Sequence, residues 1–304
     1  MQTVKPFLSY ADQVKQLKSR GMLFKDPEAA VQQLSVLHYY RLSAYWHSMR
    51  EPDSETFRPG TSFELVMDIY RFDERIRAAI STDLARIESA MRALIGHYLG
   101  KVDPLIHTKP ELLSSLAHNP NKKHSPITKY EEWYRRYKRA LHNNRHEEFV
   151  KHHRKHWGGN LPIWVAVEIM DWGMLSHLYE IAPPAAAKRV AQKCHLSDAQ
   201  LLSWLKCLNI LRNQAAHNDR IVNRNFTMRP KRPDDPRLPK LTDEDYNRAF
   251  GQLTLVQYLL KELKLPGGEL LPSVLDDFPD NDLIPFERMG APKDWRSNTF
   301  WAVD

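Results

Sequence analysis

The densest group of polar side chains with chemical potential lies in the segment LRNQAAHNDR, residues 211–220. Arg212 and Asn213 are neighbours, and His217 follows five residues after the arginine. A histidine titrates near neutral pH and can accept or donate a proton, and an arginine can hold a phosphate through two parallel hydrogen bonds. These three side chains are therefore candidates for the metal-free cleavage of RNA.

In such a reaction His217 removes the proton of a 2′-hydroxyl or protonates the leaving 5′-oxygen. Arg212 stabilises the charge that builds on the pentacoordinate phosphorus, and Asn213 orients either group. The products are a 2′,3′-cyclic phosphate and a 5′-hydroxyl. The alternative is a solvated helix end, where Arg212 and His217 only interact favourably with the negative end of the helix dipole.

The same spacing of arginine and histidine recurs at Arg92 and His97, so spacing alone identifies neither pair as a site. Glu88 precedes Arg92 by four residues, which on a helix favours an ordinary surface ion pair. If that helix face turns toward residues 211–217, Glu88 instead positions Arg92 or Arg212 within the site. Glu88, Arg92 and His97 are therefore secondary catalytic candidates.

A basic segment rich in aromatic residues, KYEEWYRRYKRALHNNRHEEFVKHHRKHW, spans residues 129–157. Cations can contact phosphates and aromatic rings can stack on unpaired bases, so the segment predicts a groove for single-stranded RNA. The candidate RNA-binding residues are Arg135, Arg136, Lys138, Arg139, Arg145, Lys151, His152, His153, Arg154 and Lys155. Four glutamates dilute the positive charge and leave a solvated helix face as the alternative. The clustered histidines lack acidic or sulfur partners at zinc-binding spacing, so we expect no metal.

The composition is that of a soluble globular chain of 304 residues, with 42% hydrophobic and 27% charged residues. The formal net charge of +7 and the 14 histidines favour a polyanionic partner. Two cysteines, Cys194 and Cys207, exclude a disulfide framework. Without a signal peptide or an apolar run long enough for a bilayer, we expect a cytoplasmic protein with no membrane contact.

Apolar spacings of three and four residues and only 11 glycines predict an all-α protein. The expected helices cover residues 9–20, 27–37, 61–100, 129–157, 161–181, 185–193, 197–217 and 242–264, with a short helix at 110–117. Ser9, Asp26 and Ser197 are the expected N-caps, and Thr61 with Glu64 has the spacing of a capping box.

Three regions follow from this pattern. Residues 1–60 form an N-terminal helical region, residues 61–264 a helical domain with an insertion at about 101–160, and residues 265–304 an irregular C-terminal tail. The longest helix, starting near residue 61, carries one apolar seam for about ten turns, up to Gly100.

The motif RNQAAHNDR resembles the R-x(4–6)-H signature of the HEPN ribonuclease superfamily. Flanking blocks are similar to one branch of it, the bacterial abortive-infection Abi family of the AbiD/AbiF type. The blocks are HYYRLSAYW at 38–46, ARIESAMRALIGHYL at 85–99, LPIWVAVEIMDWGMLSHLY at 161–179, LNILRNQAAHNDRIVNR at 208–224 and MGAPKDWRSNTFW at 289–301. Together they span nearly the whole chain.

The resemblance implies a HEPN-like helical bundle with N-terminal elaboration, and a metal-independent RNase toxin of phage defence that uses no cofactor. It implies that Arg212, Asn213 and His217 match the motif, and that Glu88 and Arg92 match polar positions of the earlier block. Some members of the branch are linked with small non-coding RNAs, so an RNA antitoxin is an expected partner.

The resemblance also implies a composite site, because two such motifs usually face each other in HEPN proteins. A monomer would have to use Arg92 and His97 as its second half. We expect instead a symmetric homodimer in which two copies of Arg212 and His217 converge. The alternatives are a non-catalytic protein that holds a small RNA, and a toxin whose target is set by a partner protein.

Overall fold

The computed structural model describes residues 4–122 and 126–302, and every regular element in those residues is helical. The α-helices are α1 (Tyr10–Ser19), α2 (Pro27–Leu37), α3 (Tyr39–Trp46), α4 (Phe63–Gly100), α5 (Lys129–Asn143), α6 (Glu148–His156), α7 (Ile163–Ala166), α8 (Trp172–Ile181), α9 (Pro184–Lys193), α10 (Asp198–Ala216), α11 (Ala249–Glu262) and α12 (Leu270–Asp276). The predicted all-α class is confirmed. None of these described helices has the length and apolar character needed to cross a membrane.

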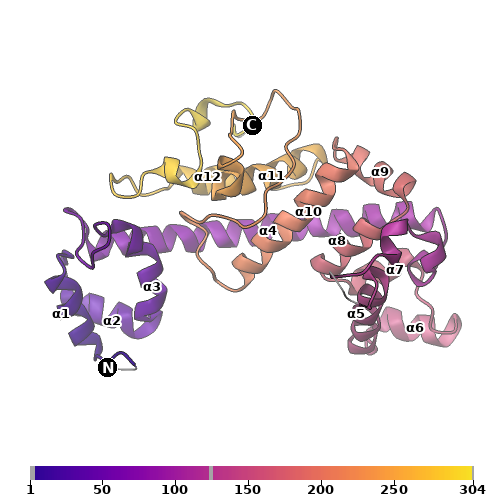
Figure 1. Ribbon diagram of the computed structural model, residues 1–304, viewed down its shortest axis with the longest axis horizontal. Coiled ribbons are helices and arrows are strands. Elements are labelled where there is room, and N and C mark those ends of the chain that lie inside the picture. The colour runs from indigo at the N-terminus through magenta and orange to yellow at the C-terminus, as the bar shows by residue number, and fades with distance from the viewer. Residues whose placement is uncertain (1–3, 123–125, 303–304) are drawn as a thin grey trace.

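The molecule is an arch built on the long helix α4 (Figure 1). Helices α1 to α3 lie at one end of α4, and α5 to α7 lie at the other end (Figure 1). Helices α10, α11 and α12 pack along α4 between them. The N-terminal helices and the α5–α6 pair extend to the same side of α4, which leaves the middle of the molecule as the underside of the arch (Figure 1).

Helix α4 is the element on which the others pack, and its predicted apolar seam is buried. Phe72, Ile76, Ile80 and Ile87 are fully enclosed. The predicted capping box at its start is wrong, because Ser62 is the N-cap and its hydroxyl accepts from the Leu65 amide.

The polar groups of that expected box have other partners. The Thr61 hydroxyl donates to the Arg58 carbonyl at 2.7 Å, and Glu64 accepts from the Lys25 amide at 2.9 Å. Glu64 thus ties the start of α4 to the turn before α2, which local spacing could not indicate. At α1, α2 and α10 the predicted caps Ser9, Asp26 and Ser197 are confirmed.

The single helix expected over residues 161–181 is broken in two. Helix α7 ends in a 3₁₀ turn over Val167–Ile169, Met170 is extended, and Asp171 caps α8 by accepting from the Met174 amide at 2.7 Å. The carbonyls of Val167 and Met170 accept from the Arg92 side chain on α4 at 3.2 and 3.0 Å. A side chain from a distant helix therefore stabilises the break.

The basic segment 129–157 is also two helices rather than one. Asn144 caps the end of α5, and both its backbone amide and its side-chain amide donate to the Ala140 carbonyl, at 2.9 and 2.8 Å. The short helix expected at 110–117 is replaced by 3₁₀ turns at Pro110–Leu112 and Ser115–His118.

The C-terminal residues differ from the expected helix 242–264 and irregular tail. A 3₁₀ turn at Asp245–Asn247 precedes α11, which starts only at Ala249. Part of the tail is helix α12, and the residues beyond it cover α11. Trp295 and Trp301 are buried, and their rings lie 5.8 and 4.9 Å from the Phe250 ring. Packing against α11 thus orders a segment that has little local periodicity.

A buried histidine, His107, joins helix α5 to the 3₁₀ turn at Ile106–Thr108. The His107 ring lies in the core and its Nε2 is 3.2 Å from the Tyr137 hydroxyl of α5. Burial lowers the pKa of His107 to about 4, so the ring is neutral in the folded protein at neutral pH. In the unfolded chain an unperturbed histidine takes up a proton near pH 6.5.

The depressed pKa predicts that stability from His107 is present above pH 6.5 and is lost as the pH falls from 6.5 toward 4. Between pH 7.5 and 5.0 the His107→Gln variant should lose roughly 2 kcal/mol less free energy of unfolding than the wild type. Urea unfolding at the two pH values measures this difference. His142→Gln, which removes an exposed histidine from α5, the helix that His107 contacts, should follow the wild type. Parallel pH dependence in the wild type and His107→Gln would contradict the assignment.

Candidate active site

The segment 211–220 forms the C-terminal end of α10. Helix α10 ends at Ala216, and Asn218 adopts the left-handed conformation with φ of 56°. The Asn218 amide donates to the Ala215 carbonyl at 3.2 Å, and the Asp219 amide donates to Gln214 at 2.8 Å. This is the Schellman arrangement, in which asparagine can replace the usual glycine. His217 is consequently the last residue before the chain reverses.

The three motif side chains lie on the exposed face of this helix end. Arg212, Asn213 and His217 are exposed, while Leu211 and Ala215 face the core. The Arg212 guanidinium donates to the side-chain oxygen Oδ1 of Asn213 at 3.4 Å, which is long for a hydrogen bond. Asn213 therefore lies beside Arg212, and its orienting role stays a prediction. A phosphate can approach both the guanidinium and the imidazole from solvent.

The chain beyond the motif is fixed by a buried carboxylate on α4. Asp73 is inaccessible to solvent and accepts from the backbone amides of Ile221 and Val222 at 3.0 and 2.7 Å. The Tyr45 hydroxyl of α3 donates to the same carboxylate at 2.7 Å, and Arg77 forms a buried ion pair with it. Four donors thus surround one side chain and hold residues 221–222 against α4.

Two arginines bind the same loop to α3. The Arg41 guanidinium donates to the Asn218 carbonyl at 2.8 Å, and Arg220 donates to the Ala44 carbonyl. The aromatic block at residues 38–46 therefore positions the helix end that carries His217. This block belongs to the N-terminal region, and nothing in its sequence predicts that role.

A hollow of about 300 Å³ lies beside the helix end, between α4 and α10. It is lined by Glu74, Arg77, Ala78, Ser81, Ala215 and Asn218. Arg77 thus reaches both the buried carboxylate and the edge of this hollow.

The secondary candidates Arg92 and His97 lie elsewhere on α4. The end of α10 meets α4 at Ala78 and Ser81, and His97 is sixteen residues beyond Ser81. At 1.5 Å per residue that separation is about 24 Å along the helix axis. Arg92 and His97 line a different hollow, against α7 and the turn that follows it. A single chain therefore does not bring His97 to His217.

Glu88 forms the ordinary ion pair that its spacing favoured. Its carboxylate accepts from Arg92 at 2.5 Å, and both side chains are largely buried. Because Arg92 also donates to two carbonyls of the α7–α8 connection, the pair joins α4 to that connection. This geometry gives Glu88 and Arg92 a structural role.

The aromatic residues of the basic segment are mostly core residues, which corrects the expected stacking surface. Trp133 and Tyr137 are buried with parallel rings 5.5 Å apart, and the Trp133 indole donates to the Met174 carbonyl. Among the aromatic residues of that segment, Trp157 is the exposed one, at 67%.

The cations of the segment divide into bound and open groups. Arg136 pairs with Asp171, Lys151 pairs with Glu148, and the His153 ring is bonded to the Phe149 carbonyl. Arg145 is half-buried and donates to the His142 carbonyl. The exposed members without an ion pair among the described residues are Arg135, Lys138, Arg139, His152, Arg154 and Lys155. Helices α5 and α6 therefore retain a positive surface, although part of it is neutralised.

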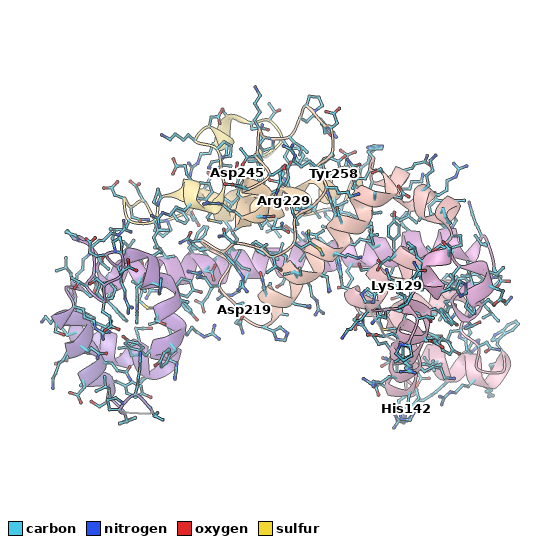
Figure 2. All side chains as sticks on the ribbon, viewed as in Figure 1. Lys129, His142, Asp219, Arg229, Asp245 and Tyr258 are labelled. Atoms are coloured by element: carbon cyan, nitrogen blue, oxygen red, sulfur yellow. The ribbon has the colours of Figure 1, made fainter. Side chains whose placement is uncertain are left out.

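The motif and the basic helices face the same side of the molecule. Figure 2 shows Asp219, two residues after His217, at the underside of the arch, and His142 at the lower end of α5. A long ligand crossing the underside would pass from the end of α10 to α5 and α6.

The supporting network was missed because its members are unremarkable in sequence. Asp73 and Arg77 have the spacing of a surface ion pair on a helix. Their position beside the seam residues Phe72 and Ile76 was the available signal, since charged residues next to a buried stripe are enclosed only when paired.

The fold and this site define an all-helical protein in which α3 and α4 hold an exposed Arg–Asn–His helix end. The chain belongs to the Abi-like protein family, whose profile matches residues 32–223. The matched segment contains α3, α4, α10 and the loop bound by Asp73. Membership of this family suggests a role in abortive infection. No curated protein and no solved structure matches the chain significantly.

Asp73→Asn should lower the free energy of unfolding by at least about 3 kcal/mol. The amide retains one acceptor oxygen but turns two hydrogens toward the Tyr45 and Arg77 donors, which leaves the buried guanidinium unpaired. Thermal and urea unfolding measure the loss. Asp68→Asn, an exposed acid on the same helix that pairs with Arg71, should change stability by less than about 1 kcal/mol. Equal effects of the two substitutions would contradict the role given to Asp73.

Proposed function

We propose that this protein is a metal-independent endoribonuclease of the HEPN type that acts as a toxin in abortive infection. The observation that supports this most directly is the exposed Arg212–Asn213–His217 helix end, held in place by the buried Asp73 network. Burying the charges of Asp73 and Arg77 costs desolvation free energy. A helix end whose only role is to terminate α10 would not need such a network to fix its backbone.

The residue types match cleavage by an internal nucleophile. One His217 removes the proton from a 2′-hydroxyl, and the 2′-oxygen attacks the adjacent phosphorus. The bond to the 5′-oxygen breaks, and a protonated imidazole donates a proton to that oxygen. Arg212 binds the non-bridging phosphate oxygens, whose negative charge grows in the transition state. The products are a 2′,3′-cyclic phosphate and a 5′-hydroxyl.

A second copy of the chain completes the acid–base pair. Arg212 and His217 are separated by about 140° around α10 and about 7.5 Å along it, so they do not share one stripe. The hollow at this helix end is lined by residues of α4 and of the end of α10, and it contains neither Arg212 nor His217 among its lining residues. In a symmetric dimer one His217 acts as base and the other as acid, with two arginines around one phosphate.

The open cations of α5 and α6 supply the RNA-binding surface. They lie on the same side of the molecule as the helix end (Figure 2). An RNA strand that follows the underside of the arch would contact both. This arrangement is also compatible with the alternative function, a non-catalytic protein that holds a small non-coding RNA, because such a protein needs only the positive surface.

Wild-type protein incubated with total RNA in EDTA should yield fragments, while Arg212→Ala and His217→Ala should lower the cleavage rate by at least about a hundredfold. The fragment ends should be resistant to ligation until the cyclic phosphate is removed. Arg71→Ala and His47→Ala, which remove exposed residues of the same types from other helices, serve as controls and should cleave like the wild type.

Three results separate the candidates. Cleavage that is lost only in the motif variants supports the nuclease. Cleavage that is unchanged in those variants assigns the activity to another site. If the wild type and all variants bind RNA but none cleaves it, and no cleavage occurs in phage-challenged cells that express the wild type, the RNA-holding alternative is supported.

Arg139→Glu with Lys155→Glu should weaken RNA binding and reduce its salt dependence, because both cations are exposed on the basic surface. Four phosphate contacts would make the wild-type affinity fall roughly fiftyfold between 50 and 200 mM salt. Filter binding with a catalytically inactive His217→Ala protein measures this. Arg71→Glu with Arg75→Glu makes the same charge change on α4 and should have a smaller effect. An affinity that hardly depends on salt would remove RNA binding from α5 and α6.

A further inference from the structure

The hollow between the C-terminal end of α4 and α7 has a volume of about 320 Å³ and the composition of a ligand site. Its lining includes an aromatic ring, Trp164, the cationic or titratable residues Arg92, His97 and Lys101, and one carboxylate, Glu168. The volume is at the lower end of the range for small-molecule pockets. The chemistry described at His217 uses none of these residues.

Two glycines allow this hollow to form. A Cβ atom on Gly100 would lie 2.8 Å from Cε3 of Trp164, and one on Gly96 would lie 3.0 Å from its Cα. Glycine inside a helix costs about 1 kcal/mol relative to alanine, and α4 contains both one turn apart. The two glycines let the Trp164 residue lie directly on the backbone of α4.

The Trp164 side chain is exposed although its helix is otherwise apolar. It is 51% exposed, whereas Ile163 and Ala166 beside it are fully buried. One side of the residue rests on α4 and the other is open to the hollow. An open indole next to cations is the arrangement on which unpaired bases stack.

The cationic and the acidic side chains of the hollow lie on different elements. His97 and Lys101 are exposed and one turn apart on α4. Arg92 is held in place by its bonds to Val167, Met170 and Glu88. Glu168 is exposed on the turn that follows α7. Cations thus come from α4, and the carboxylate comes from the opposite wall.

We propose that this hollow binds a guanosine nucleotide, either free or as an unpaired residue of RNA. The base stacks on Trp164, and the phosphate is held by His97 and Lys101. Glu168 accepts two hydrogen bonds from N1–H and the N2 amino group, and guanine alone among the four RNA bases presents two adjacent donors on that edge. The site would give the protein a base preference at a distance from His217.

Binding of the free nucleotide does not depend on the proposed cleavage, so the two proposals fail separately. Calorimetric titration of the full chain with GMP, AMP, CMP and UMP should show GMP binding at least tenfold tighter than CMP or UMP. Trp164→Ala should weaken GMP binding by about tenfold or more. Glu168→Gln should remove the preference for GMP while AMP binding is kept. Lys101→Ala should weaken the binding of GMP but not the binding of guanosine, which has no phosphate.

Trp157→Ala provides the matched control, since it removes an exposed tryptophan that does not line the hollow, and it should bind GMP like the wild type. Circular dichroism melting of each variant shows that it is folded. Titration of His217→Ala protein with UUGUU and UUUUU then identifies the source of the ligand. A preference for the G-containing oligonucleotide that is lost in Trp164→Ala assigns an RNA residue, and a preference confined to GMP assigns the free nucleotide. The proposal is overturned if neither GMP nor the oligonucleotide is preferred, or if Trp164→Ala binds like the wild type.

Discussion

The carboxylate of Asp73 is the contact on which the geometry of the candidate site depends. It is completely buried and receives hydrogen bonds from two backbone amides beyond α10, from Tyr45 on α3 and from Arg77 on α4. Ile221, Val222 and Tyr45 are buried, so their donors would lose this partner without a ready replacement from water. The network therefore joins the N-terminal helices, the long helix and the motif into one unit. The family match, residues 32–223, contains every residue of this network.

The proposed chemistry requires a second surface, and the shape of the molecule is consistent with that need. The motif lies on the underside of an arch, with helices extending to the same side at both ends of α4 (Figure 1). An exposed Arg–Asn–His set in a single chain can hold a phosphate but cannot provide a base and an acid at once. A second motif from another copy, together with an RNA strand on the basic helices, would supply what one chain lacks.

The two arginine–histidine pairs of the chain have different surroundings and therefore different roles. Both R-x(4)-H pairs lie near α4, but Arg212 and His217 are exposed, while Arg92 is bonded to the carbonyls of Val167 and Met170. Arg92 thereby stabilises the break before α8 and forms part of the wall against Trp164. A motif of two residue types carries no information about this difference, which arises from the helices packed around each copy.

The sequence by itself determined the all-α class, most helix positions, three N-caps and the family, because these depend on local periodicity, short-range hydrogen bonds and residue types. It also identified Arg212, Asn213 and His217 as a polar group at a helix end. Only the tertiary structure decided that Asp73 holds the loop beyond them, that Arg92 stabilises a break in the helix expected at 161–181, and that Trp133 and Tyr137 are buried rather than open to bases. These features join residues 75 to 149 positions apart in the chain, or depend on which face of α5 packs on α8. Contacts of that kind are set by the packing of whole helices on α4, which no local pattern of residue types specifies.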